Sequence, residues 1–390
     1  MFNRSIINEI NQLKQEFRVL TIIGPRQAGK TTLCKLAFPD YKYLSLEDPE
    51  TRLWAEEDPK SLLQSYNEFV IFDEIQRTPN LLSYIQGIVD TDNKLAQFIL
   101  TGSHQLELSA AVSQSLAGRT ALLTLLPLSL CEIASEDDDY AHLSPNQHLI
   151  NGFMPGKLPN KMSNQRFYRA YFQTYVERDV RALIQLKDFT KFENFVRLCA
   201  GRVGQLLNAA SIATDVGVSA KTISEWLSVL EASFIIYRLN PYYENYGKRI
   251  IKSSKIYFID VGLAAWLLGI ETEAQMQRDP LRGQLFENMV IIEALKTQLN
   301  AGKDPRLYFF RDSHGHEVDL LIQKGRKLQP VEIKTSATWQ KSFTKGIRYF
   351  QTLAQAQAIA GRVIYSGDQI RQSKDYASLK YTNIKALFDE

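Results

Sequence analysis

A glycine-rich loop between a strand and a helix is the feature of this sequence that most constrains its fold. The loop has the pattern G-x-x-x-x-G-K-T, follows the apolar run 19–23 and leads into a helical run over 32–38. This context predicts a phosphate-binding loop, because its backbone N–H groups can point inward and the helix dipole favours an anion. We expect phosphate contacts from Gly24, Pro25, Arg26, Gln27, Ala28, Gly29, Lys30, Thr31 and Thr32. Lys30 is expected to reach the β- and γ-phosphates, and the Thr31 hydroxyl to bind Mg²⁺.

A second motif is an apolar run that ends in two carboxylates, Asp73 and Glu74. A continuous apolar run is typical of a buried parallel strand, and such sheets carry their chemistry at the carboxyl ends of the strands. We therefore expect Asp73 to hold Mg²⁺ and Glu74 to act as the catalytic base on the attacking water. A solvated acidic strand end is the alternative, which the phosphate loop makes the weaker interpretation. The acidic pair favours hydrolysis over simple nucleotide holding.

A third predicted strand covers 98–103 and ends in small polar residues. It is similar to the sensor strand of AAA-like ATPases, which lies between the other two strands and contacts the γ-phosphate or the water. The resemblance makes Ser103, next to His104, the polar sensor; an ordinary strand-to-turn exit is the alternative. Arg119 could stabilise transition-state charge on the γ-phosphate, in its own chain or in a neighbour. A surface salt bridge is the commoner role of such an arginine.

Composition excludes several classes of protein. The chain has 390 residues, enough for two or three domains, and its formal net charge of +3 permits nucleic-acid binding without arguing for it. Cys34, Cys131 and Cys199 lack metal-ligand spacing, so we expect neither a zinc site nor disulfides. The polar N-terminus and the absence of a long apolar run favour a cytoplasmic protein without a membrane partner.

The chain divides into four predicted parts. Strands alternate with helices up to about residue 132, which is typical of a parallel sheet with helices on both faces. An acidic segment then precedes a loop and a helix with aromatic residues at helical spacing. We expect an α/β P-loop core over 1–135, a helical lid or linker over 136–190, a helix-turn-helix region over 191–272 and a further α/β domain over 273–390.

The segment 207–260 has the layout of a winged helix. One helical run ends at Gly217, Ser219 can cap a second helix, and two strands flank a basic hairpin, behind which Lys255 follows. DNA contacts are expected from Lys221, Thr222 and Ser224 at the start of the second helix, and from Lys248 and Arg249 in the hairpin. Packing against protein is the alternative role of such a module.

The last third of the sequence has a second constellation of charged residues. Asp319 lies on one predicted strand, and strand alternation points Glu332 and Lys334 of the next strand to one face. Glu287 shares a face of an upstream helix with apolar residues, where a carboxylate needs a partner. These carboxylates could hold Mg²⁺ beside a catalytic lysine, as in restriction-endonuclease-like nucleases. Solvated charges on an alternating strand are the alternative.

Together these motifs resemble a prokaryotic family of AAA-like P-loop ATPases with a C-terminal domain of unknown function. The resemblance covers nearly the whole chain and rests on the phosphate loop, on Asp73-Glu74-Ile75-Gln76 and on the paired motifs Glu317-Val318-Asp319 and Val331-Glu332-Ile333-Lys334. It implies ATP as the nucleotide, an AAA-like core, a winged helix and a restriction-endonuclease-like domain.

Three functions are consistent with these motifs. The first is Mg²⁺-dependent ATP hydrolysis coupled to DNA binding or remodelling. The second is an ATP-regulated DNA endonuclease of the kind used in defence, and the third is a nucleotide-operated switch that binds a protein partner. The sequence leaves open whether the protein forms a homo-oligomer.

Overall fold

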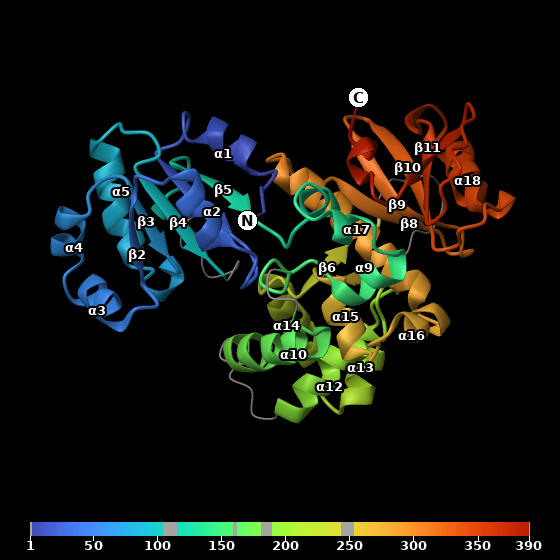
Figure 1. The fold of residues 1–390 in the computed structure, drawn as a ribbon, viewed down its shortest axis with the longest axis horizontal. Helices are drawn as coiled ribbons and strands as arrows, with labels where there is room; N and C mark the ends of the chain where they lie inside the picture. Colours follow the sequence, from blue (N-terminus) through green and yellow to red (C-terminus); the bar gives the residue numbers. More distant parts are fainter. Residues whose placement is uncertain (1, 104–114, 159–161, 181–188, 243–252, 390) are drawn as a thin grey trace.

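The computed structural model of the protein describes residues 2–103, 115–158, 162–180, 189–242 and 253–389 (Figure 1). Its helices are α1 (Ile7–Leu13), α2 (Lys30–Ala37), α3 (Pro49–Glu57), α4 (Pro59–Ser65), α5 (Leu81–Thr91), α7 (Leu130–Ala134), α8 (Asp138–Ala141), α9 (Pro145–Asn151), α10 (Asn164–Tyr171), α12 (Phe189–Ala200), α13 (Ala209–Val216), α14 (Ala220–Ala232), α15 (Val261–Leu267), α16 (Glu273–Arg278), α17 (Arg282–Asn300) and α18 (Lys345–Ala354). Its strands are β1 (Val19–Ile23), β2 (Lys42–Ser45), β3 (Val70–Asp73), β4 (Phe98–Gly102), β5 (Thr120–Thr124), β6 (Ile236–Leu239), β7 (Lys255–Phe258), β8 (Leu307–Arg311), β9 (Glu317–Lys324), β10 (Lys327–Lys334), β11 (Gly361–Tyr365) and β12 (Tyr376–Lys380).

The N-terminal part is built on a five-stranded parallel sheet with the order β2-β3-β4-β1-β5. β4 pairs with β1 on one side and with β3 on the other, so the third predicted strand does lie between the first two. The phosphate loop follows β1 and the acidic pair closes β3, so both reach the carboxyl edge of the sheet. The predicted parallel α/β sheet is confirmed.

Both faces of this sheet are buried, which explains its continuous apolar strands. Leu20 and Ile22 of β1 point into a core shared with α1 and α2, whereas Val19 and Ile23 point into the core that includes α4 and α5. Cys34 on α2 is fully buried, and all three cysteines are free thiols.

The middle of the chain is mainly helical. α10 continues as a wider helix over Phe172–Val180, and α13 and α14 form the predicted helix-turn-helix. Gly217 ends α13 in a left-handed conformation, and the Ser219 hydroxyl caps α14 by accepting from the Thr222 N–H at 3.0 Å. β6 and β7 pair antiparallel, and the hairpin predicted between them lies outside the described residues, as does His104.

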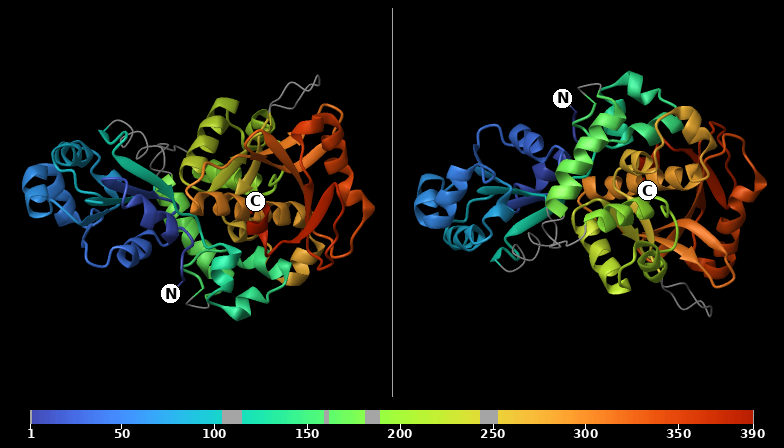
Figure 2. Two further views of the ribbon diagram at one scale, coloured as in Figure 1. Left: turned by 90° about the horizontal axis from the view of Figure 1, so that it is seen from above. Right: turned by 90° about the horizontal axis from the view of Figure 1, so that it is seen from below.

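The C-terminal part is a second sheet with the order β12-β11-β10-β9-β8. β8, β9 and β10 pair antiparallel, whereas β10, β11 and β12 pair parallel. The two sheets lie at opposite ends of the molecule, and α17 lies between them in every view (Figures 1 and 2). None of the helices in the described ranges is both long and apolar enough to cross a membrane.

Candidate functional site

Two glycines shape the loop between β1 and α2. A Cβ on Gly24 would lie 2.0 Å from the carbonyl oxygen of Leu125, so only glycine permits this approach. Gly29 has φ 91°, a conformation that favours glycine, and directly precedes the first residue of α2. The loop therefore turns sharply into a helix N-terminus, the arrangement that binds phosphate through backbone N–H groups.

The first predicted metal and phosphate residues lie together. The Lys30 ammonium is buried and donates to the carbonyl oxygens of Gly24 and Pro25 at 2.9 and 3.0 Å. Burial lowers the pKa of Lys30, and the charges of Glu74 and Asp73 counteract that shift. The Thr31 hydroxyl donates to Asp73 at 2.8 Å, so the loop and the end of β3 are in direct contact.

Asp73 and Glu74 are neighbours in sequence but have different partners. Asp73 also accepts from the Tyr43 hydroxyl at 2.6 Å and from the Thr101 hydroxyl. Glu74 has φ 59° and accepts from the Ser103 hydroxyl at 2.9 Å and from the side-chain amide of Gln76. The two carboxylates are thus held separately, one beside the phosphate loop and one beside the end of β4.

Arg119 is not brought to this edge of the sheet. It directly precedes β5, which is parallel to β1, and it therefore lies at the amino edge, across the sheet from the phosphate loop. Its guanidinium pairs with Asp90 at 2.5 Å. Five strand residues separate the two edges, about 16 Å of chain, so Arg119 cannot serve the loop of its own chain in this conformation.

The predicted DNA-contacting residues that the structure describes lie at the start of α14. Lys221 and Ser224 are exposed and Thr222 is half-buried. The Lys221 ammonium lies 4.0 Å from Glu225, which offsets part of its charge. Lys248 and Arg249 lie outside the described residues.

Glu287 pairs with Lys255, the first residue of the strand that follows the predicted basic hairpin. Lys255 on β7 is buried, and its ammonium lies 2.9 Å from Glu287 and 2.5 Å from Glu317. The Tyr257 hydroxyl also donates to Glu287, at 2.6 Å. Burial raises the pKa of Glu287, and Lys255 counteracts that shift. Lys255 does begin a strand, as predicted, and the strand turns its side chain into this cluster.

Asp319, Glu332 and Lys334 form the second half of the same cluster. The Lys334 ammonium lies 2.8 Å from Asp319 and 2.5 Å from Glu332. Burial raises the pKa of Glu332 to about 9, and the nearby charge of Asp319 adds to the shift. Burial opposes the charge of Asp319, but Lys334 and Lys255 hold its pKa below the ordinary value.

This cluster borders a cavity of about 600 Å³, lined in part by Lys255, Glu287, Arg311, Glu317, Asp319 and Lys334. Glu332 does not line the cavity, and its carboxylate lies so close to Gly346 that a Cβ there would approach it within 2.0 Å. Within the described residues, no three histidine, cysteine or acidic side chains are arranged to hold a metal ion. The lysines stand between the predicted ligands, so the structure gathers these residues without forming the expected metal-ligand set.

Several residues at these sites were not predicted. Arg4, Tyr43 and Lys255 come from segments distant in sequence from the motifs they contact, so no spacing pattern marks them. Glu317 belongs to the predicted Glu317-Val318-Asp319 motif, but its contact with Lys255 depends on how separate elements pack. Gln76 belongs to the motif that begins at Asp73, but its contact with Glu74 depends on the short 3₁₀ turn over Ile75–Arg77.

Comparison with known proteins agrees with this geometry. Residues 16–134 match an AAA domain, and residues 282–387 match a domain of unknown function, DUF4143. Residues 144–274 match another domain of unknown function, DUF8612. An uncharacterized protein of Mycobacterium tuberculosis is 30% identical over 359 residues, which cover 90% of this chain and 77% of that protein. The chain belongs to a P-loop ATPase family with a C-terminal DUF4143 region.

Another relative is an uncharacterized protein of Haemophilus influenzae, 25% identical over 360 residues that cover 84% of this chain and 85% of the relative. Among solved structures, the Walker-type ATPase of Pyrococcus abyssi has a TM-score of 0.47 and 14% identity, covering 68% of this chain and 96% of that one. AMPPCP-bound DnaA from Aquifex aeolicus has a TM-score of 0.30 and 13% identity, covering 58% of this chain and 86% of that one.

Proposed function

We propose that the protein binds ATP with Mg²⁺ and hydrolyses it at the carboxyl edge of the β1–β5 sheet. The observation that carries this proposal is the separation of the acidic pair. Asp73 contacts Thr31 beside the phosphate loop, whereas Glu74 lies with Ser103 at the end of β4. One carboxylate is therefore available to a metal and the other to a water.

The residues present suit a magnesium nucleotide. The loop glycines leave room for backbone donors, and Lys30 is a buried cation whose charge an anionic phosphate would satisfy. Thr31 and Asp73 would hold Mg²⁺ through their oxygens, and the bound ion would neutralise charge on the phosphate oxygens. Membership of a P-loop ATPase family favours ATP as the nucleotide.

In this proposal Glu74 accepts the proton of an attacking water. Ser103 and Gln76 hold its carboxylate in position. The side-chain oxygen of Gln76 is buried and has no hydrogen-bond partner among the described residues, so a water donating to it would satisfy a costly orphaned acceptor. Ser103 would report the γ-phosphate through its contact with Glu74.

The test is phosphate release and ATP binding by a Glu74→Gln variant. We expect hydrolysis to fall at least about 100-fold while ATP binding persists, because the amide keeps the shape but cannot accept the proton. Glu57→Gln, on an exposed part of α3, is the matched control and should hydrolyse normally. Equal hydrolysis by the Glu74→Gln variant and the wild type would remove Glu74 from the mechanism.

We further propose that hydrolysis is coupled to DNA through the helix-turn-helix region. The exposed start of α14 supports this, since Lys221 and Ser224 are open to a phosphate backbone. The proposed parts are an ATPase core over 1–135, a lid over 136–190, a winged helix over 191–272 and a nuclease-like domain over 273–390. If Arg119 serves a nucleotide site, it does so in a neighbouring copy, after leaving Asp90.

A second candidate function is Mg²⁺-dependent DNA cleavage at the C-terminal cluster. The observation that favours it is the gathering of Glu287, Asp319 and Lys334 around one cavity, with Glu332 paired to Lys334. Metal binding there would require Lys255 and Lys334 to release the carboxylates. Asp319→Asn should then abolish cleavage and leave ATP hydrolysis unchanged, whereas intact DNA under all conditions would contradict this function. ATP binding without turnover would instead support a nucleotide-operated switch.

A further inference from the structure

Arg4 joins the phosphate loop to the segment that follows β5. Its guanidinium is buried and donates to the carbonyl oxygens of Ala28 and Leu126 at 2.8 and 2.6 Å. Its Nε lies 3.3 Å from the buried carboxylate of Glu132, which compensates the charge. Because this arginine is buried and its partners are all within the protein, its role is to hold these segments together.

The contact with Ala28 determines the direction of a donor in the loop. No peptide bond in the described residues is cis, and in a planar trans peptide the carbonyl and the next N–H point in opposite directions. When Arg4 holds the Ala28 carbonyl outward, the Gly29 N–H must point inward, toward the place where the loop receives phosphate. Gly29 has no side chain that could fix the orientation of this peptide, so the hydrogen bond from Arg4 to the Ala28 carbonyl fixes it.

Glu132 connects Arg4 to elements farther from the phosphate loop. Its carboxylate accepts from the backbone N–H groups of Ser5 and Ser129 at 2.7 and 2.8 Å. It therefore fixes both the N-terminal segment that carries Arg4 and the start of α7.

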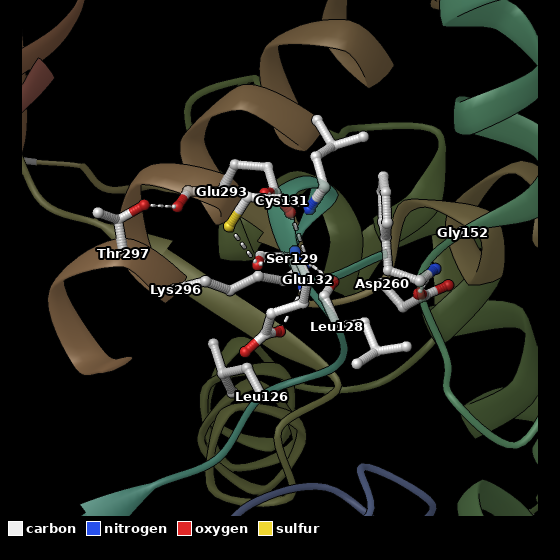
Figure 3. A network of polar contacts seen from close by, with 12 residues as sticks. Leu126, Leu128, Ser129, Cys131, Glu132, Gly152, Asp260, Glu293, Lys296 and Thr297 are labelled. Carbon is white, nitrogen blue, oxygen red and sulfur yellow. Dashed lines mark hydrogen bonds and ion pairs between the residues drawn. The ribbon is translucent and has the colours of Figure 1, made fainter. Parts of the chain in front are cut away.

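Two charged residues of α17, Glu293 and Lys296, lie beside the start of α7 (Figure 3). Glu293 accepts from the Leu130 N–H at 2.9 Å, and Lys296 donates to the Leu128 carbonyl at 2.7 Å. Glu293 and Lys296 are both buried and lie 2.7 Å apart. A buried ion pair often stabilises no more than apolar side chains of similar size, so its value here is to fix one arrangement of α7 on α17.

The same helix carries Glu287 of the C-terminal cluster. Glu293 lies six positions after Glu287, about 9 Å along a helix. α17 therefore connects the two regions. A shift of the phosphate loop that moves Leu126 or Glu132 can be transmitted along this short, stiff helix to the cluster around Lys255.

We propose that Arg4 is a positioning residue of the nucleotide site, and that its contacts through Glu132 and the Glu293–Lys296 pair couple nucleotide binding to α17 and the C-terminal cluster. This proposal rests on the proposed function, because it needs a phosphate in the loop.

The positioning role is tested by ATP binding to Arg4→Met and Arg4→Lys variants. We expect Arg4→Met to weaken ATP binding about tenfold or more, with partial rescue by lysine, which can satisfy one carbonyl but not two. Arg18→Lys is the matched control, because Arg18 also donates to a backbone carbonyl, that of Val89, but lies at the amino edge of the sheet. Normal ATP binding by a folded Arg4→Met variant would overturn the positioning role. If Arg4→Met does not fold, the comparison of Arg4→Lys with Arg18→Lys decides.

Coupling is tested by hydrogen exchange of residues 285–296 with and without ATP. In the wild type we expect ATP to slow exchange there at least about twofold. A double variant, Glu293→Leu with Lys296→Met, should keep ATP binding and lose this response. Glu193→Leu with Arg197→Met, an exposed pair on α12, should keep both. A response that survives in the α17 double variant would overturn the coupling. Absence of ATP binding by the wild type would instead overturn the proposed function itself.

Discussion

At the scale of single residues, the site depends on two adjacent carboxylates that do different work. Strand alternation would send Asp73 and Glu74 to opposite faces of the sheet, but Glu74 has left the strand with φ 59°. A non-glycine residue in this conformation costs about 1 kcal/mol or more, and such strain clusters at functional sites. Here it turns Glu74 toward Ser103 while Asp73 stays beside Thr31.

The role of Asp73 predicts a specific dependence on Mg²⁺. We expect Asp73→Asn to raise the Mg²⁺ concentration needed for half-maximal ATP binding about tenfold or more, because a carboxylate is a far better magnesium ligand than an amide. Nucleotide titrations at several Mg²⁺ concentrations measure this. Asp40→Asn, at an exposed position, should behave like the wild type. An unchanged Mg²⁺ requirement in Asp73→Asn would show that the metal is held elsewhere.

The raised pKa of Glu332 predicts a dependence of stability on pH. Its pKa of about 9 in the folded protein exceeds the ordinary value of a glutamate, so its contribution to stability is full at low pH and is lost as the pH rises toward about 9. Glu332→Gln removes this loss. Thermal unfolding from about pH 6 to about pH 9 should therefore show the variant gaining stability relative to the wild type. A constant difference between the two proteins across this range would contradict the assignment.

At the scale of elements, local patterns predicted more than distant ones. Three features each arise from one continuous stretch of sequence: the loop before α2, the acidic end of β3 and the helix-turn-helix of α13 and α14. In such stretches the helix or strand propensity, the capping residues and the hydrophobic periodicity agree. The environments of Arg4 and Lys255 could not be predicted, because their partners are brought to them only by the packing of separate elements. Whether Arg119 lies near the phosphate loop depends on which end of β5 it occupies, and a pattern of residue types does not show this.

One buried aspartate joins three elements of the helical part. Asp260 caps α15 by accepting from the Leu263 N–H at 3.1 Å, and it also accepts from the Phe153 N–H and the Tyr168 hydroxyl at 2.7 and 2.6 Å. We expect Asp260→Ala to lower the free energy of unfolding by about 2 kcal/mol or more, because buried donors lose their partner.

Denaturant unfolding of this variant provides the measurement. Asp215→Ala, which breaks an exposed ion pair with Arg202, is the control and should cost less than about 1 kcal/mol. Similar losses in the two variants would mean that Asp260 is not a structural centre of this region.

At the scale of the whole molecule, one helix lies between two sheets with separate charged sites. α17 contributes Glu293 and Lys296 to the P-loop side and Glu287 to the C-terminal cluster. This arrangement explains how a nucleotide in one part could influence the other without a shared active site. The coupling is then a free energy between two sites and acts in both directions.

The proposed coupling of hydrolysis to DNA makes DNA a test of the whole arrangement. If DNA binds through α14, it should accelerate ATP hydrolysis, and Lys221→Ala should weaken that acceleration while leaving hydrolysis without DNA unchanged. Salt titration should show a shallower dependence of DNA binding in the variant, by about one phosphate contact. Full acceleration in Lys221→Ala would direct the search to another surface.

The most direct test of an ATPase site at the carboxyl edge of the β1–β5 sheet is Mg²⁺-dependent phosphate release from ATP by the purified protein, with and without duplex DNA. The Glu74→Gln variant supplies the background. We expect release above that background that requires Mg²⁺ and increases with DNA. Release no greater than that of Glu74→Gln under every condition would contradict the central claim that this edge of the sheet hydrolyses ATP.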